Sequence, residues 1–184
     1  MNRREMYALD DFFDMEGPSQ LSWSLWKSWQ EESRQKQILD ADAFLTKHFY
    51  PLGMKGNTLV IDVSDPDPKN FIIEFIYETY AQKTGIKLIG NRVGDFPCPL
   101  HARSLMSEYL TVRETGQPLC HEIDQTMLDL SRNYRRILLP LRGQDKKISK
   151  VLVVSRLMRP VEKLPAPAPI PTPANLAPRP SATI

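Results

Sequence analysis

The sequence predicts an α+β fold, in which helices cover one face of a five-stranded antiparallel sheet and a helical extension precedes the sheet. Two observations support this prediction. Apolar residues follow a helical period up to about residue 50, and a strand-like period takes over near residue 58. Two strand patterns, a helical stretch and three further strand patterns then follow one another, which is typical of helices packed on an antiparallel sheet.

The first helix of the extension is predicted over residues 20–38, with Ser19 as its N-cap. Trp23, Trp26 and Trp29 are three residues apart, and this spacing drifts only slowly around a helix. The three rings therefore form one broad apolar stripe. The stripe packs either on the core of its own domain or on a second copy of the chain, and the sequence leaves both interpretations open.

A second helix of the extension is predicted over residues 40–49, capped by Asp40 or Asp42. Its apolar face is spaced as a helix requires and consists of Phe44, Leu45, His48 and Phe49. His48 is therefore interpreted as a packed or edge residue. The helix ends before Gly53.

Two strands are predicted over residues 58–63 and 71–78, and the prolines and aspartates of residues 65–68 form the turn between them. The second strand alternates, and the residues of one of its faces are all large and apolar. We expect this face to point to the core: Phe71, Ile73, Phe75 and Tyr77.

The long helix is predicted over residues 100–115, and Gly116 ends it. Its apolar stripe consists of Ala102, Leu105, Met106, Tyr109 and Leu110. Three strands follow, over residues 119–128, 134–141 and 148–157, and a turn at residues 142–147 joins the last two as a hairpin.

Composition divides the chain into three parts. Residues 1–55 form the helical extension, residues 56–158 the sheet domain, and residues 159–184 a proline-rich tail. Eight of the sixteen prolines fall from Pro160 onward, where large apolar side chains almost disappear. Such a segment cannot form a core, and we expect it to be extended and disordered.

Charge and composition exclude several classes of function. Twenty-four basic and twenty-two acidic side chains give a formal charge of only +2, which offers no reason to expect nucleic acid as a partner. No stretch is long and apolar enough to cross a membrane, and the acidic first residues do not resemble a secretory signal. Cys98 and Cys120 do not have the spacing of a disulfide framework or a metal site. We therefore expect a cytoplasmic protein.

Motifs of common enzymes are absent from the sequence. It contains no dinucleotide-binding, phosphate-loop or zinc-protease motif. Residues 65–70 have the aspartates of a calcium loop but lack its glycine and its bidentate glutamate, and we interpret them as a turn. No nucleophile is visibly paired with a base. We expect no enzymatic activity and no metal site.

The remaining polar side chains are interpreted as structural. His121 stands between Cys120 and Glu122, but adjacent strand residues point to opposite faces, so these three cannot share a metal. The basic residues around the last hairpin are interpreted as a solvated edge that protects the sheet from further pairing. They are Arg132, Arg135, Arg136, Lys146, Lys147 and Lys150.

The ordered set of motifs resembles the PAS domain, and in particular a bacterial single-domain PAS family. Residues 71–78 (FIIEFIYE) are followed by residues 85–90 (GIKLIG), which are similar to the step after the second PAS strand. The long helix ends at Gly116 just before a strand, as in that family. Residues 134–141 (YRRILLPL) resemble its tyrosine–arginine–proline strand. The resemblance covers residues 56–158.

The resemblance implies a sensory or regulatory module of signal transduction that acts by binding a protein partner or by dimerisation. It also implies a site for a small ligand between sheet and helices. The ligand pocket would be lined by Phe71, Ile73, Phe75, Tyr77, Leu105 and Tyr109, unless these side chains interdigitate and leave no cavity. Trp23, Trp26 and Trp29 would form the dimer interface. The alternative is a haem-based or other cofactor-binding sensor, with His101 as the axial ligand.

Overall fold

The computed structural model describes most of the sheet domain and of the helical extension. The described residues are 3–6, 20–34, 40–52, 57–76, 88–96, 98–127, 130–157 and 162–163. The predicted boundary near residue 55 lies outside them. So does the proline-rich tail from residue 164 onward.

The sheet contains the five predicted antiparallel strands. They are β2 (Asn57–Asp62), β3 (Ile72–Ile76), β4 (Leu119–Met127), β5 (Leu130–Arg142) and β6 (Ile148–Leu157). Their order across the sheet is β4-β5-β6-β2-β3, so the first strand of the five lies between the last and the second. The predicted fold class and the predicted hairpin between β5 and β6 are confirmed.

Two short strands that the sequence analysis did not predict extend this sheet. The strand β1 (Arg3–Met6) pairs antiparallel with the outer edge of β4. The strand β7 (Glu162–Lys163) pairs with β5 at Leu130 and Ser131, and it lies inside the segment predicted to be disordered. Both strands are only a few residues long, and such segments carry little periodicity that could mark them in a sequence.

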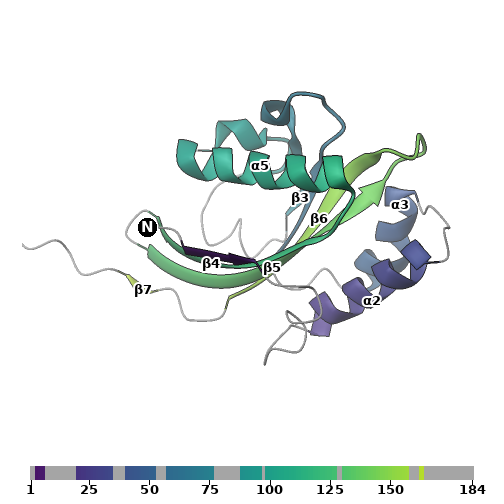
Figure 1. Cartoon of the computed structure of the whole chain (residues 1–184), viewed down its shortest axis with the longest axis horizontal. Coiled ribbons are helices and arrows are strands. Elements are labelled where there is room, and N and C mark those ends of the chain that lie inside the picture. Colours follow the sequence, from purple (N-terminus) through teal and green to yellow (C-terminus); the bar gives the residue numbers. More distant parts are fainter. Residues whose placement is uncertain are drawn as a thin grey trace, which may run out of the picture.

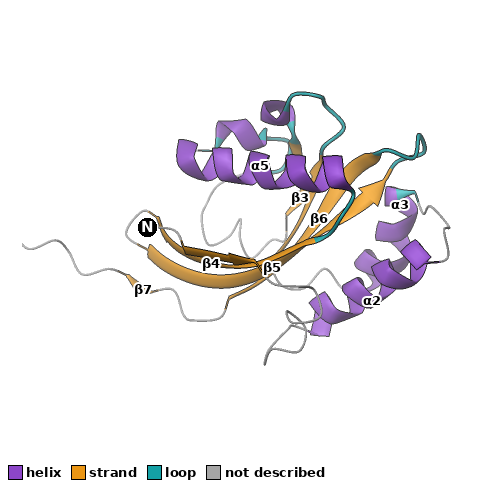
Figure 2. Cartoon of the chain, in the orientation of Figure 1, coloured by secondary structure: helices purple, strands orange, loops and turns teal. Residues whose placement is uncertain are grey.

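Helices cover both faces of the sheet (Figures 1 and 2). The helix α5 (Pro99–Thr115) crosses one face, as predicted. The helical extension lies on the opposite face and consists of α2 (Gln20–Arg34), α3 (Ala41–Phe44) and the π-helical turn η1 (Leu45–Phe49). No helix of the described segments is long and apolar enough to cross a membrane.

The ends of these helices follow the signals in the sequence. The Asp40 carboxylate accepts a hydrogen bond of 2.8 Å from the Asp42 backbone N–H and so caps α3. Gly116 has a φ of +62°, which side chains disfavour, and its N–H donates to the Val112 carbonyl to end α5. Residues 45–49 continue the predicted second helix with π-type rather than α-type hydrogen bonds.

The two faces have separate apolar cores. On the α5 face the core joins that helix to β2, β3 and β6 and consists mainly of Ile61, Val63, Phe71, Ile73, Ile76, Leu105, Tyr109, Val112, Leu138, Val151 and Val153. On the other face the core joins the helical extension to the sheet and consists mainly of Leu25, Trp26, Phe44, Phe49, Val60, Ile137, Leu139, Leu152 and Val154.

A β-bulge breaks the predicted alternation of β3. Val60 pairs with Phe75 and Ile61 with Ile73, so Glu74 has no residue opposite it. One extra residue reverses the faces beyond it. Phe71 and Ile73 lie in the α5 core, whereas Phe75 packs on the opposite face, with its ring 5.4 Å from that of Phe49. The prediction that Phe75 shares a face with Phe71 and Ile73 is therefore wrong.

The extension also covers part of the edge of β5. Leu119 begins β4 opposite Leu138, so β5 extends beyond its neighbour. Pro140 in this stretch has no N–H, and its carbonyl accepts a hydrogen bond of 2.8 Å from Trp29 Nε1. Asp40 forms a β-bridge with Arg142 further along the same strand. The extension is thus attached to the sheet by backbone contacts as well as by its apolar face.

Candidate functional site

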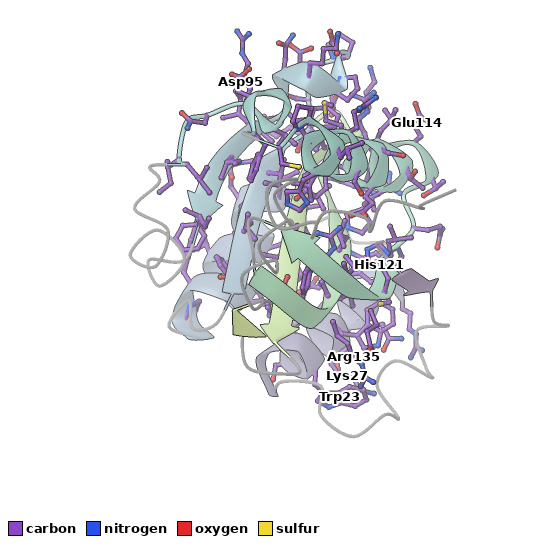
Figure 3. All side chains as sticks on the ribbon, turned by 90° about the vertical axis from the view of Figure 1, so that its left-hand side faces the viewer. Trp23, Lys27, Asp95, Glu114, His121 and Arg135 are labelled. Carbon is purple, nitrogen blue, oxygen red and sulfur yellow. The ribbon has the colours of Figure 1, made fainter. Side chains whose placement is uncertain are left out.

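Three charged or titratable side chains meet in the interior between α5 and the sheet. Glu108 comes from α5, His121 from β4 and Arg136 from β5, and they are 5%, 2% and 4% exposed. Figure 3 shows His121 on the side of the sheet that faces α5. Glutamate and arginine side chains are almost never buried unless they are paired. We refer to these three residues as the polar triad.

Direct contacts connect the members of the polar triad. Arg136 Nη2 forms an ion pair with Glu108 Oε2, and Arg136 Nε donates a hydrogen bond of 3.2 Å to His121 Nε2. The same His121 nitrogen lies 3.7 Å from Glu108 Oε2. Because Nε2 accepts a hydrogen bond from Arg136, a neutral His121 carries its own hydrogen on Nδ1. One arrangement of three elements therefore brings all three side chains into contact.

The position of Arg136 corrects an interpretation of the sequence. It was assigned with its basic neighbours to a solvated edge, but it is buried and paired with Glu108. Its neighbour Arg135 points to the other face, where its Nε lies 2.8 Å from Glu122 Oε2. The sequence pattern contained this signal. Arg136 is two residues from Leu138 of the α5 core, so both side chains point to the same face of β5. Glu108 lies between Leu105 and Val112 on the buried stripe of α5.

Four of the six predicted pocket residues come together in the α5 core. They are Phe71, Ile73, Leu105 and Tyr109, and all four are buried against one another. Phe75 packs on the opposite face, and Tyr77 lies outside the described residues. The four side chains belong to the same interior between α5 and the sheet as the polar triad. Their role as a ligand pocket stays a prediction.

The three tryptophans of α2 have different surroundings. Trp26 is 4% exposed inside the core of its own chain, and Trp29 stacks on it with ring centres 5.4 Å apart. Trp23 is 41% exposed, with Lys27 Nζ 4.7 Å from its ring centre. Figure 3 shows Trp23 and Lys27 at the end of the molecule away from α5. The structure thus favours packing in the chain's own core for Trp26 and Trp29 and leaves Trp23 accessible.

The described residues do not fit a haem held by His101. His101 lies on the first turn of α5, and its ring centre is 5.5 Å from that of Phe96. Phe71 and Tyr109 fill the interior on which this helix packs, and both are fully buried. An iron bound to His101 would need that interior to open. Across the described part of the chain, no group of three or more histidine, cysteine, aspartate or glutamate side chains could hold a metal ion.

Cys120 and His121 lie on opposite faces of β4, as alternation predicts. Cys120 belongs to the core under the helical extension, and its burial raises the pKa of the thiol to about 12. A thiol with such a pKa is protonated and unreactive at neutral pH. Of these two neighbours, His121 is therefore the one that contacts the polar groups of the α5 interior.

Ion pairs at the rim attach the extension to the sheet. Lys150 Nζ on β6 lies 2.7 Å from Asp42 of α3 and 2.8 Å from Glu74 of the bulge. Burial alone would lower the pKa of Lys150, but hydrogen bonds to the two carboxylates outweigh it and raise the pKa. Lys150 is therefore a cation shared between helix and sheet, and the prediction of a solvated lysine at this position is wrong.

Comparisons with known proteins concern the fold. No protein-family model and no curated protein sequence matches the chain. Among solved structures, it is similar to the PAS domain of BvgS from Bordetella pertussis, with 17% identity over 59% of this chain and 80% of that one and a TM-score of 0.46. A sensory box sensor histidine kinase from Vibrio cholerae matches with 13% identity, 71% and 98% coverage and a TM-score of 0.44.

A light-oxygen-voltage domain described with a flavin analogue matches with 15% identity, 60% and 82% coverage and a TM-score of 0.44. At these identities a likeness concerns the fold alone. A five-stranded antiparallel sheet with α5 across one face is the arrangement that the resemblance of the sequence implies. The chain has a PAS-like α+β fold.

Proposed function

We propose that the chain is a sensory or regulatory module of signal transduction, which binds a small polar ligand in the α5 interior and acts through a protein partner or a second copy. The polar triad is the observation that carries this proposal. The attraction between paired buried charges compensates for their loss of hydration only when the geometry of the pair is well defined. A ligand with its own acidic or basic group would compete for Glu108 or Arg136 and so favour a second arrangement.

The strand β5 offers a route from the polar triad to the surface. Arg136 and Pro140 are four residues apart on β5, a separation of about 13 Å in an extended strand. Arg136 belongs to the triad, and the Pro140 carbonyl holds Trp29 of α2. A shift of β5 at Arg136 would therefore change the seating of α2. The accessible Trp23 on that helix is the contact that we propose for the partner or the second copy.

Hydrogen–deuterium exchange tests this proposal. We expect Glu108→Gln, which keeps the shape of the side chain and removes its charge, to increase amide exchange in α2 as well as in α5. The matched control is Glu122→Gln, because Glu122 pairs with Arg135 on the opposite face of the same sheet. Unchanged exchange in α2 of the Glu108→Gln variant would contradict the route through β5.

Native mass spectrometry of the full chain purified from its own host tests ligand and assembly together. We expect the wild-type protein to carry a bound small molecule or to form a defined complex, and the Glu108→Gln variant to lose that species. A Trp23→Ala variant is expected to keep the ligand and to lose the complex. A wild-type protein that is monomeric and carries no added mass would overturn the proposal.

A further inference from the structure

A concave site lies beside the first turns of α5, away from the polar triad. Two 3-10 turns, η3 (Pro68–Asn70) and η4 (Val93–Asp95), and the first turns of α5 enclose a groove of about 370 Å³. In Figure 3, Asp95 of this groove lies beyond α5 and His121 lies on the other side of the helix. This volume is within the range of small-molecule sites in proteins.

The walls of the groove are held in place by backbone contacts. The Val93 N–H donates to the Phe71 carbonyl over 2.8 Å, and Arg92 forms a β-bridge with Ile72, which places residues 91–93 along the outer edge of β3. A Cβ atom at Gly94 would lie 2.8 Å from the Lys69 carbonyl oxygen, so only glycine allows the two turns to come this close.

Side-chain hydrogen bonds fix the loop that leads into η3. Arg113 of α5 donates to the carbonyls of Val63, Asp65 and Pro66. The Asp65 carboxylate in turn accepts from the backbone N–H of Asp67. The groove therefore exists before any ligand arrives, and binding would not need to order this loop.

Three basic side chains from three elements line the groove. They are Lys69 of η3, Arg92 beside β3 and Arg103 of α5. Within the described residues, none of the three forms an ion pair with a carboxylate. Three cations that converge on one hollow repel one another, and an anion between them would remove that repulsion. Two arginines also match the planar shape of a carboxylate or the oxygens of a phosphate.

The other lining residues restrict the chemistry of the ligand. Ala102 and Met106 give the groove an apolar floor, which favours a carbon skeleton over an inorganic ion. Asp67 and Asp95 leave a net charge of about one positive unit, which disfavours a polyphosphate and favours hydroxyl donors. We propose that this groove binds a small hydroxylated organic anion, with its carboxylate or phosphate held by Arg92, Arg103 and Lys69.

Isothermal titration calorimetry with the full chain tests this assignment. The probes are glycerate, glycerol 3-phosphate and inorganic phosphate, each at the same ionic strength as a sodium chloride control. We expect saturable binding of glycerate or glycerol 3-phosphate, and the preferred probe identifies the anionic group. Arg92→Gln and Arg103→Gln are each expected to weaken binding about tenfold, which is typical of one charged hydrogen bond.

The matched control is Arg34→Gln, because Arg34 is an exposed arginine at the end of α2. We expect it to bind within about twofold of the wild-type protein. Equal weakening by Arg34→Gln, binding of inorganic phosphate alone, or no saturable binding of either organic anion would overturn the assignment. The groove shares no lining residue with the polar triad, so the result is independent of the function proposed for the α5 interior.

Discussion

The two faces of the sheet differ in where they keep their charges. On the α5 face, Glu108, His121 and Arg136 lie in the interior. On the face under the helical extension the core cluster is apolar, and the charged groups form pairs around it, as in the pair of Lys150 and Asp42. Charges at a rim orient elements at little cost, whereas buried charges depend on a complete set of partners. The comparison indicates attachment for the second face, and the first is the face for which we propose a switchable interaction.

The largest effect on the free energy of unfolding is expected at the polar triad, and it tests the difference between the two faces. Glu108→Ala leaves Arg136 buried without its carboxylate, and we expect a loss of about 3–5 kcal/mol in the free energy of unfolding. Urea denaturation measures it. The double variant Glu108→Leu with Arg136→Met replaces both charges by apolar groups and is expected to regain most of that loss. A single variant that loses less than about 1 kcal/mol would contradict the comparison.

A somewhat smaller effect is expected in the apolar core under the extension. Leu25 is fully buried there, and Leu25→Ala is expected to cost about 3 kcal/mol through lost contacts and a residual cavity. The matched control is Leu100→Ala, because Leu100 is exposed on α5, and we expect a change of less than about 0.5 kcal/mol. Equal stabilities of the two variants would show that α2 is not seated on the sheet.

The hydrogen bond between Trp29 and Pro140 is expected to contribute less again. Trp29→Phe keeps a ring against Trp26 and leaves the Pro140 carbonyl without this donor. We expect a loss of about 1–2 kcal/mol, measured by thermal unfolding. Trp23→Phe removes an exposed indole from the same helix and serves as control. If Trp23→Phe destabilises the chain as much as Trp29→Phe does, the edge contact is not what holds α2.

The smallest effect is expected at the two ion pairs that Glu32 of α2 forms with Lys47 and His48 of η1. Hydrogen bonds from Lys47 and His48 lower the pKa of Glu32. A carboxyl group whose pKa falls on folding stabilises the chain above its unfolded pKa of about 4.3, and this contribution is lost as the pH falls through the lower folded value. We expect less than about 1 kcal/mol. In the Glu32→Gln variant, the free energy of unfolding should fall less steeply as the pH is lowered below about 4.3. Denaturation at a series of pH values measures this, and an unchanged slope would contradict the prediction.

Much of the fold could be predicted from the sequence because its signals are local. The period of residues 100–115 and the conformation that Gly116 allows determine α5, and the alternation of residues 148–157 determines β6. The β-bulge at Glu74 could not be predicted, because it depends on how β2 pairs with β3. The strand β1 was missed for a similar reason, since its four residues become a strand only beside β4.

The candidate site was harder to predict than the fold. Four apolar residues of the predicted pocket do meet, because each lies on a regular buried stripe. The polar triad was missed because a charged side chain in a sequence is interpreted as solvated unless its partner is known. Glu108 and Arg136 are 28 positions apart and meet only after α5 has crossed the sheet. The groove beside η3 and η4 depends on the same long-range packing.

The proline at position 140 has a consequence for how the chain behaves in crowded solution. An uncovered stretch of strand recruits further strands, and β5 reaches past β4 where Pro140 and Arg142 lie. Pro140 cannot donate to an incoming strand, and the indole of Trp29 already occupies its carbonyl. The helical extension therefore also guards the sheet against growth into aggregates, and a chain shortened to begin at residue 56 would lose that protection.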